Sequence, residues 1–121
     1  MDPAVLRWRL LLLAGEDHIR MVEALWEFGW PDAPVPGAPP QEAVRATLRA
    51  LVAEGLVTLL WSREDDQATA PIPADQQLAA FDDPAVWDPP EDADWIVRFT
   101  TTAAGDEALR HRPPGVPPSS G

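Results

Sequence analysis

Few side chains in this chain of 121 residues could carry out covalent chemistry. The chain has no cysteine and no tyrosine, and its serines are Ser62, Ser119 and Ser120. His18 and His111 stand far apart in the sequence and belong to no catalytic or metal-binding motif. Cysteine nucleophiles, thiol redox chemistry and disulfide scaffolds are therefore excluded. We expect a protein that is not an enzyme and that holds no cofactor.

Carboxylates are plentiful, and one dense group of them has the composition of a calcium-binding loop. The group consists of Asp82, Asp83, Asp88, Glu91, Asp92 and Asp94. An EF-hand loop needs alternating acids, a glycine at its sharp turn and a terminal glutamate. No glycine occurs between positions 56 and 104, and prolines interrupt the acidic run at 84, 89 and 90. The sequence predicts a solvated acidic loop here, with no metal site.

Six tryptophans in a chain without tyrosine form the other distinctive group. Exposed tryptophan is enriched among the residues that dominate binding at protein interfaces. Trp8, Trp26 and Trp95 lie among apolar neighbours and are predicted to pack in the core. Trp30, on a Pro-rich loop, and Trp61, at the end of a predicted strand, are the candidate partner-binding residues. Packing of loop residues over these two is the alternative.

The charge of the chain is unevenly distributed. Acidic residues outnumber basic ones 20 to 9, there is no lysine, and the formal net charge is −11. Residues 64–97 hold ten carboxylates and neither lysine nor arginine. Affinity for nucleic acid comes largely from basic side chains that neutralise phosphates, so this distribution disfavours DNA binding. Two modes of protein recognition are compatible with it: a basic partner that meets the acidic loop, or a partner strand that adds to the edge of the predicted strands.

Sequence signals for export and membrane insertion are weak. Arg7 and Arg9 precede a short apolar run, which is the outline of a secretory signal, but acidic residues follow the run too soon. No apolar run approaches the ~20 residues that a membrane-spanning helix requires. We expect a cytoplasmic protein with no membrane partner.

The predicted elements are helices, two strands and a long connection. Helices are expected over residues 3–14, with Asp2 as N-cap and Gly15 just beyond the end, over 16–28, and over 40–54, closed by Gly55. Strands are expected over 56–61 and 95–100, followed by a short helix over 103–110. Residues 1–112 form the predicted domain, and the Pro-, Gly- and Ser-rich tail 113–121 is predicted to be disordered.

The connection between the two strands, residues 64–93, is too long for a tight hairpin. Asp75 is expected to cap a short helix that carries Leu78 and Phe81. Trp87 is expected to anchor the excursion to the core.

Two strings in the sequence resemble the winged-helix family. VRATLRALVAEGLV, residues 44–57, resembles the third helix of that family running through its terminating glycine into the first wing strand. FTTTAAG, residues 99–105, resembles the turn after the second wing strand in regulators of the MarR and PadR type. The resemblance implies an α+β fold: three helices, a two-stranded antiparallel wing with a long acidic insertion, and a short C-terminal helix.

The resemblance also implies a role for the third helix. In such regulators this helix reads base edges in the major groove, which would assign Gln41, Arg45 and Arg49 to DNA contacts. Because the wing is acidic, we favour a non-catalytic binding module for protein recognition or regulation, and keep the DNA-binding regulator as the alternative. Self-association is a second form of protein partner, because the first helix, with its apolar run from Leu10 to Leu13, could form a homodimer.

Overall fold

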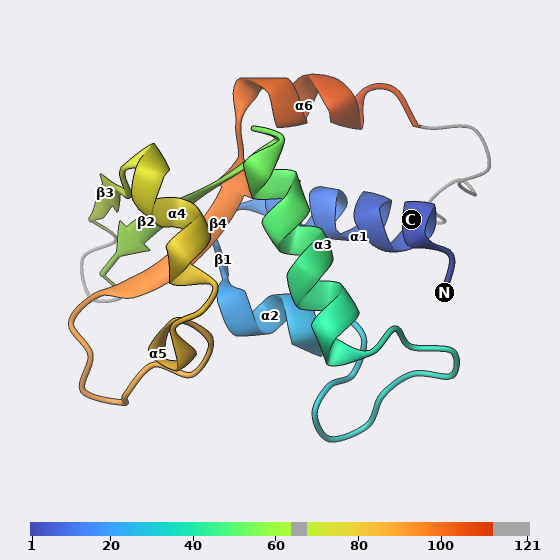
Figure 1. The fold of residues 1–121 in the computed structure, drawn as a ribbon, viewed down its shortest axis with the longest axis horizontal. Helices are drawn as coiled ribbons and strands as arrows, with labels where there is room; N and C mark the ends of the chain where they lie inside the picture. Colours follow the sequence, from blue (N-terminus) through green and yellow to red (C-terminus); the bar gives the residue numbers. More distant parts are fainter. Residues whose placement is uncertain (64–67, 113–121) are drawn as a thin grey trace.

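The computed structural model describes residues 1–63 and 68–112, which form a mixed α+β fold (Figure 1). In these residues four strands make one antiparallel sheet in the order β1-β4-β2-β3, accompanied by six helices. The strands are β1 (Ile19–Arg20), β2 (Val57–Ser62), β3 (Thr69–Pro71) and β4 (Ile96–Thr101). The helices are α1 (Pro3–Glu16), α2 (Met21–Trp26), α3 (Gln41–Ala53), α4 (Ala74–Ala80), α5 (Pro84–Trp87) and α6 (Ala103–Leu109). The predicted tail 113–121 lies outside the described residues.

The predicted pairing of the two long strands is confirmed. β2 and β4 are antiparallel neighbours, in a register that runs from Val57 opposite Thr101 to Ser62 opposite Ile96. The α+β class is therefore confirmed, and β1, β3 and α5 are additional to the predicted elements.

Helix α1 begins as predicted but does not end at Gly15. The Asp2 side chain accepts a hydrogen bond from the amide of Ala4 at 2.8 Å, and the helix continues through Gly15 to Glu16. A Cβ at this glycine would stand 2.6 Å from Cδ1 of Leu109 on α6, the end of a flexible side chain. α1 packs against α3, β4 and α6, as expected for a helix that is apolar around most of its circumference.

The helix predicted over residues 16–28 is wrong in its first part. Ile19 and Arg20 form β1, which pairs with Phe99 and Arg98 at the free edge of β4. The helix begins only at Met21. Arg20 is its N-cap, and the Arg20 amide donates a hydrogen bond to the Glu23 side chain at 2.8 Å. Helical spacing of apolar residues was present, but pairing with the sheet decides the conformation here.

Helix α3 ends as predicted. Its buried stripe consists of Val44, Leu48, Leu51 and Val52. Gly55 has a φ of +79°, the left-handed conformation that suits glycine at a helix end. The chain then turns directly into β2.

The connection between β2 and β4 folds into β3, α4 and α5. Leu78 is half-buried against the core, and Phe81 and Trp87 are buried, as predicted. The indole of Trp87 donates a hydrogen bond to the Phe81 carbonyl at 3.1 Å. The prediction that Asp75 caps the helix is wrong, because α4 starts at Ala74, two residues earlier than such a cap requires, and Pro73 takes the N-cap position.

A single side chain continues the edge of β2 where β3 ends. The Gln77 amide oxygen accepts a hydrogen bond from the Leu59 amide at 3.1 Å, and its nitrogen donates to the Ile72 carbonyl at 2.9 Å. Gln77 thus bridges the two backbones at the point where direct pairing stops.

Helix α6 is fixed to the turn between α3 and β2. The Thr102 hydroxyl accepts from the Gly105 amide and donates to the Gly55 carbonyl at 2.6 Å, while the Thr102 amide donates to the Leu56 carbonyl.

None of the helices in the described ranges has the length and apolar character that crossing a membrane requires.

The contact of α6 with the turn between α3 and β2 generates a stability prediction for Gly105. A Cβ at this buried position would stand 2.0 Å from the Leu56 carbonyl oxygen, a backbone atom that cannot turn away. We expect Gly105→Ala to destabilise the protein by about 2 kcal/mol or more, measured by urea unfolding. Gly55→Ala, which meets no atom but places alanine at positive φ, should cost about 1 kcal/mol. A Gly105→Ala variant as stable as the parent would contradict this packing of α6.

Candidate functional site

Two exposed tryptophans meet at one end of the sheet. Trp61 and Trp95 line a wide-open hollow of about 340 Å³ together with Ala70, and we call these three residues the tryptophan hollow. The exposed fractions are 40% for Trp61 and 39% for Trp95, which are large for indole side chains. The partner-binding candidate Trp61 is therefore exposed and has a second tryptophan beside it.

The alternation of strand residues explains why the hollow is apolar. Val57 and Leu59 share a face of β2 with Trp61, and both are almost fully buried. On β4, Phe99 and Val97 lie opposite Leu59 and Trp61 and are buried as well. The hollow thus continues the core face of the sheet past the part that the helices cover.

Arg63 lies across one of the two indoles. Its guanidinium carbon stands 5.6 Å from the centroid of the Trp95 ring. The Arg63 amide also donates to the Ala68 carbonyl at 2.9 Å, extending the β2–β3 pairing. One face of Trp95 is accordingly a cation–π site within the chain itself.

The chain that leads into the hollow is acidic. Within residues 68–97 there are seven carboxylates, all exposed, and no basic side chain: Asp75, Asp82, Asp83, Asp88, Glu91, Asp92 and Asp94. In the described ranges none of them forms an ion pair. Figure 1 shows the segment between α5 and β4 sweeping round to the end of the sheet where β2 and β3 meet. The chain that enters the hollow is therefore negatively charged, while the Arg63 guanidinium lies at the hollow itself.

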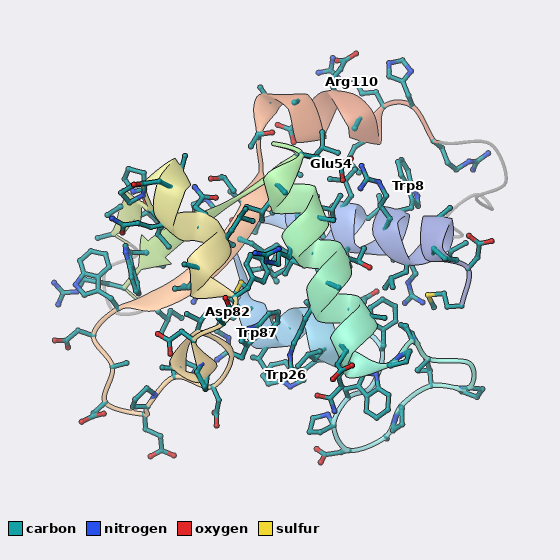
Figure 2. All side chains as sticks on the ribbon, viewed as in Figure 1. Trp8, Trp26, Glu54, Asp82, Trp87 and Arg110 are labelled. Carbon is teal, nitrogen blue, oxygen red and sulfur yellow. The ribbon has the colours of Figure 1, made fainter. Side chains whose placement is uncertain are left out.

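Two of the tryptophans predicted for the core are not buried. Trp8 is buried as predicted, but Trp95 is exposed and so is Trp26, at 48%. Trp26 lies at the end of α2, under the guanidinium of Arg20 at 5.1 Å (Figure 2). Trp95 was missed as a site residue because its neighbours Val97 and Phe99 are core residues. The adjoining Asp94 was the one signal that the strand had left the core.

The second partner-binding candidate, Trp30, is in a different place and is used differently. Its side chain is half-buried against the core, and its indole donates a hydrogen bond to the Pro39 carbonyl at 2.8 Å. The bond ties down the Pro-rich loop between α2 and α3, which Figure 1 places on the far side of the molecule from β2 and β3. The structure does not bring Trp30 and Trp61 together.

The candidate DNA-contacting residues lie on α3 as expected, but the Arg45 side chain already contacts Trp87 and Gln41. Its guanidinium carbon stands 5.3 Å from the Trp87 ring centroid, and its Nη2 is 3.5 Å from the Gln41 amide oxygen. Its Nε is buried without a hydrogen-bond partner in the described residues. Of the three candidates, Gln41 and Arg45 are half-buried and Arg49 is exposed.

The acidic connection flanks Arg45. A hollow of about 360 Å³ is lined by Arg45 of α3 and by residues from the end of α4 through α5: Phe81, Asp82, Pro84, Trp87 and Asp88. Figure 2 labels Asp82 and Trp87 close together there. Carboxylates beside this arginine oppose the approach of a phosphate backbone. The surface of α3 around Arg45 is thus partly covered by the connection between β2 and β4.

The apolar first helix is largely covered within the chain. Leu10 and Leu11 are buried, and Leu12 and Leu13 are half-buried. The open part of α1 is a hollow of about 460 Å³ shared with α6 and lined by Ala4, Arg7, Trp8, Leu11, Leu56, Ala108 and His111. The apolar run from Leu10 to Leu13, which suggested a homodimer, therefore packs mainly within the chain's own core.

Over the described ranges, no group of three His, Asp or Glu side chains is placed to hold a metal ion. Comparison with protein-family models, with curated proteins and with solved structures gave no match to this chain.

The contrast between Trp87 and Trp61 can be tested by unfolding. Trp87 is buried and contacts Phe81, with ring centroids 5.9 Å apart, so Trp87→Ala should destabilise the protein by about 3–5 kcal/mol. Trp61→Ala should cost less, about 1–2 kcal/mol, because 40% of Trp61 is already exposed. Urea unfolding followed by circular dichroism measures both. Equal losses would mean that Trp61 is a structural residue.

Proposed function

We propose that this chain is a non-catalytic binding module that recognises a protein segment through the tryptophan hollow. The observation that carries the proposal is the pair Trp61 and Trp95, exposed side by side on the continuation of the core face of the sheet. Exposed apolar patches on soluble proteins mark interaction sites. Clustered tryptophan is also the side chain with the largest share of interface hot spots.

We further infer that the scaffold is of the winged-helix type, with β2 and β4 as the wing. What supports this is the order helix, short strand, helix, helix, strand, strand, given by α1, β1, α2, α3, β2 and β4. The sheet order β1-β4-β2 within the larger sheet agrees with that arrangement. In this reading β3, α4 and α5 are an insertion into the wing.

The DNA-binding regulator remains the alternative, with Gln41, Arg45 and Arg49 as its contacts. Arg49 is exposed and favours it. Against it stand the contact of Arg45 with Trp87 and the seven exposed carboxylates of the wing insertion. A protein partner makes better use of the same features, because it needs no phosphate neutralisation.

Peptide selection tests the main proposal without a known partner. Random peptides displayed on phage are selected against the full chain, with the Trp61→Ala/Trp95→Ala variant as counter-target. We expect enriched peptides whose affinity falls about tenfold or more on that variant, because truncating hot-spot tryptophans costs at least that much. Trp26→Ala, which removes an exposed tryptophan elsewhere, is the matched control and should leave binding unchanged. Failure to enrich, or equal binding to all three proteins, would refute the proposal.

Binding to random duplex DNA tests the alternative. With Arg45 engaged, Arg49 and Arg45 together can neutralise at most about two phosphates, so the dissociation constant should be ~100 µM or weaker near physiological salt. The slope of log affinity against log salt should lie near −2 or shallower. A submicromolar constant with a slope steeper than about −4, lost in Arg45→Ala/Arg49→Ala, would put the DNA-binding regulator first.

A further inference from the structure

We infer that the anchor bound in the tryptophan hollow is an arginine side chain of a basic partner segment, lying flat on the ring of Trp61. The inference rests on the proposed function and adds the chemistry of the partner. Three observations carry it: the use of indole rings elsewhere in the chain, the position of Arg63, and the charge around the hollow.

The first observation concerns the exposed tryptophans. Trp26, Trp61 and Trp95 each expose more than a third of their surface. Arg20 lies over Trp26 at 5.1 Å and Arg63 over Trp95 at 5.6 Å, so two of the three rings carry a guanidinium of the same chain. Within residues 1–63 and 68–112 no guanidinium lies over Trp61. Among the three exposed indoles in these ranges, Trp61 is thus the one whose ring carries no guanidinium.

The second observation concerns geometry. Arg63 reaches the Trp95 ring from the end of β2, two residues after Trp61, which places a guanidinium at the rim of the hollow already. Guanidinium is planar, weakly hydrated and stacks on aromatic rings, which makes it better suited than a lysine ammonium to a half-open apolar hollow. The hollow is wide enough, at about 340 Å³, for a second such group over Trp61.

The third observation concerns charge. The segment that enters the hollow carries Asp88, Glu91, Asp92 and Asp94, all exposed, within the uninterrupted acidic stretch 68–97. Asp94 directly precedes Trp95 in the sequence, and charges act over ~8 Å at physiological salt. An acidic or phosphorylated segment would be repelled here, and a neutral apolar segment would leave these carboxylates unused. Charge complementarity therefore selects a basic partner.

Titration of short peptides into the ¹⁵N-labelled full chain tests the inference, with the six indole N–H signals as reporters. The probe is a capped synthetic peptide that alternates arginine with alanine. A second peptide carries citrulline in place of arginine, which keeps the shape and removes the charge. We expect the arginine peptide to shift the Trp61 and Trp95 signals saturably. The citrulline peptide should bind at least about tenfold more weakly.

Matched variants separate a specific site from general attraction. Trp61→Leu keeps an apolar side chain and removes the ring, and should weaken the arginine peptide about fivefold or more, while Trp26→Leu should not. Asp92→Asn/Asp94→Asn should weaken it more than Glu16→Gln/Asp17→Asn, which changes the net charge equally but lies at the end of α1. Each variant is first checked for its fold by circular dichroism.

Two results would overturn the inference. One is equal affinity for the arginine and citrulline peptides; the other is arginine-peptide binding that ignores Trp61→Leu and responds equally to both charge-changing pairs. If phage-selected peptides lack arginine yet depend on Trp61 and Trp95, the proposed function stands and only the arginine anchor fails. If selection also finds nothing, both fail.

Discussion

The antiparallel pairing of β2 with β4 is the constraint on which the rest of the structure depends. It sets Ser62 opposite Ile96, so the chain between them must leave and return at the same end of the sheet. Closing such a long loop has an entropic cost that grows slowly with its length, and the loop must offset it with packing of its own. Ile72, Phe81 and Trp87 supply that packing within the common core. The same pairing brings Trp61 and Trp95 to one place and leads the acidic chain past them.

The connection between β2 and β4 also changes which side chains α3 exposes. Trp87 is held by its hydrogen bond to Phe81, and it receives the guanidinium of Arg45 on its ring. An arginine that could have faced outward is thereby drawn into the contact between α3 and α5. The outward surface of α3 keeps Arg49 and Glu42 among alanines at positions 46, 50 and 53. The connection between β2 and β4 thus engages Arg45 of α3 and also places Trp95 beside Trp61 at the end of the sheet.

Local signals predicted much of this fold. The apolar stripe of α3, its stop at Gly55 and the two long strands follow from periodicity and turn chemistry, and the pairing of those strands follows from their need for a partner. Trp87 was predictable as an anchor because a long connection needs one. The break at Ile19 and Arg20 was not, because the free edge of β4 that captures them exists only in the folded sheet.

The candidate site was predictable only in part, for a related reason. The end position of Trp61 on its strand indicated exposure, and the structure bears this out. Trp95 has the same sequence context as a core residue, and only the extent of helix cover over the sheet decides its exposure. The prediction that Gly15 ends the first helix was wrong, because the helix continues to Glu16 and Gly15 lies within it, beside Leu109 of α6.

The side chain of Gln77 has a consequence for the behaviour of the molecule in concentrated solution. The string VTLLW in β2 is rich in β-branched and aromatic residues and carries no charge, which is the composition of segments that polymerise edge to edge. Beside it, β3 occupies the outer edge, Pro71 withholds an amide, and Gln77 takes the next free backbone amide, that of Leu59. Such devices protect natural sheets from adding strands of other molecules. The chain can therefore contain an apolar, uncharged strand with an exposed tryptophan at its end, while β3 and Gln77 keep the edge of that strand from pairing with strands of other molecules.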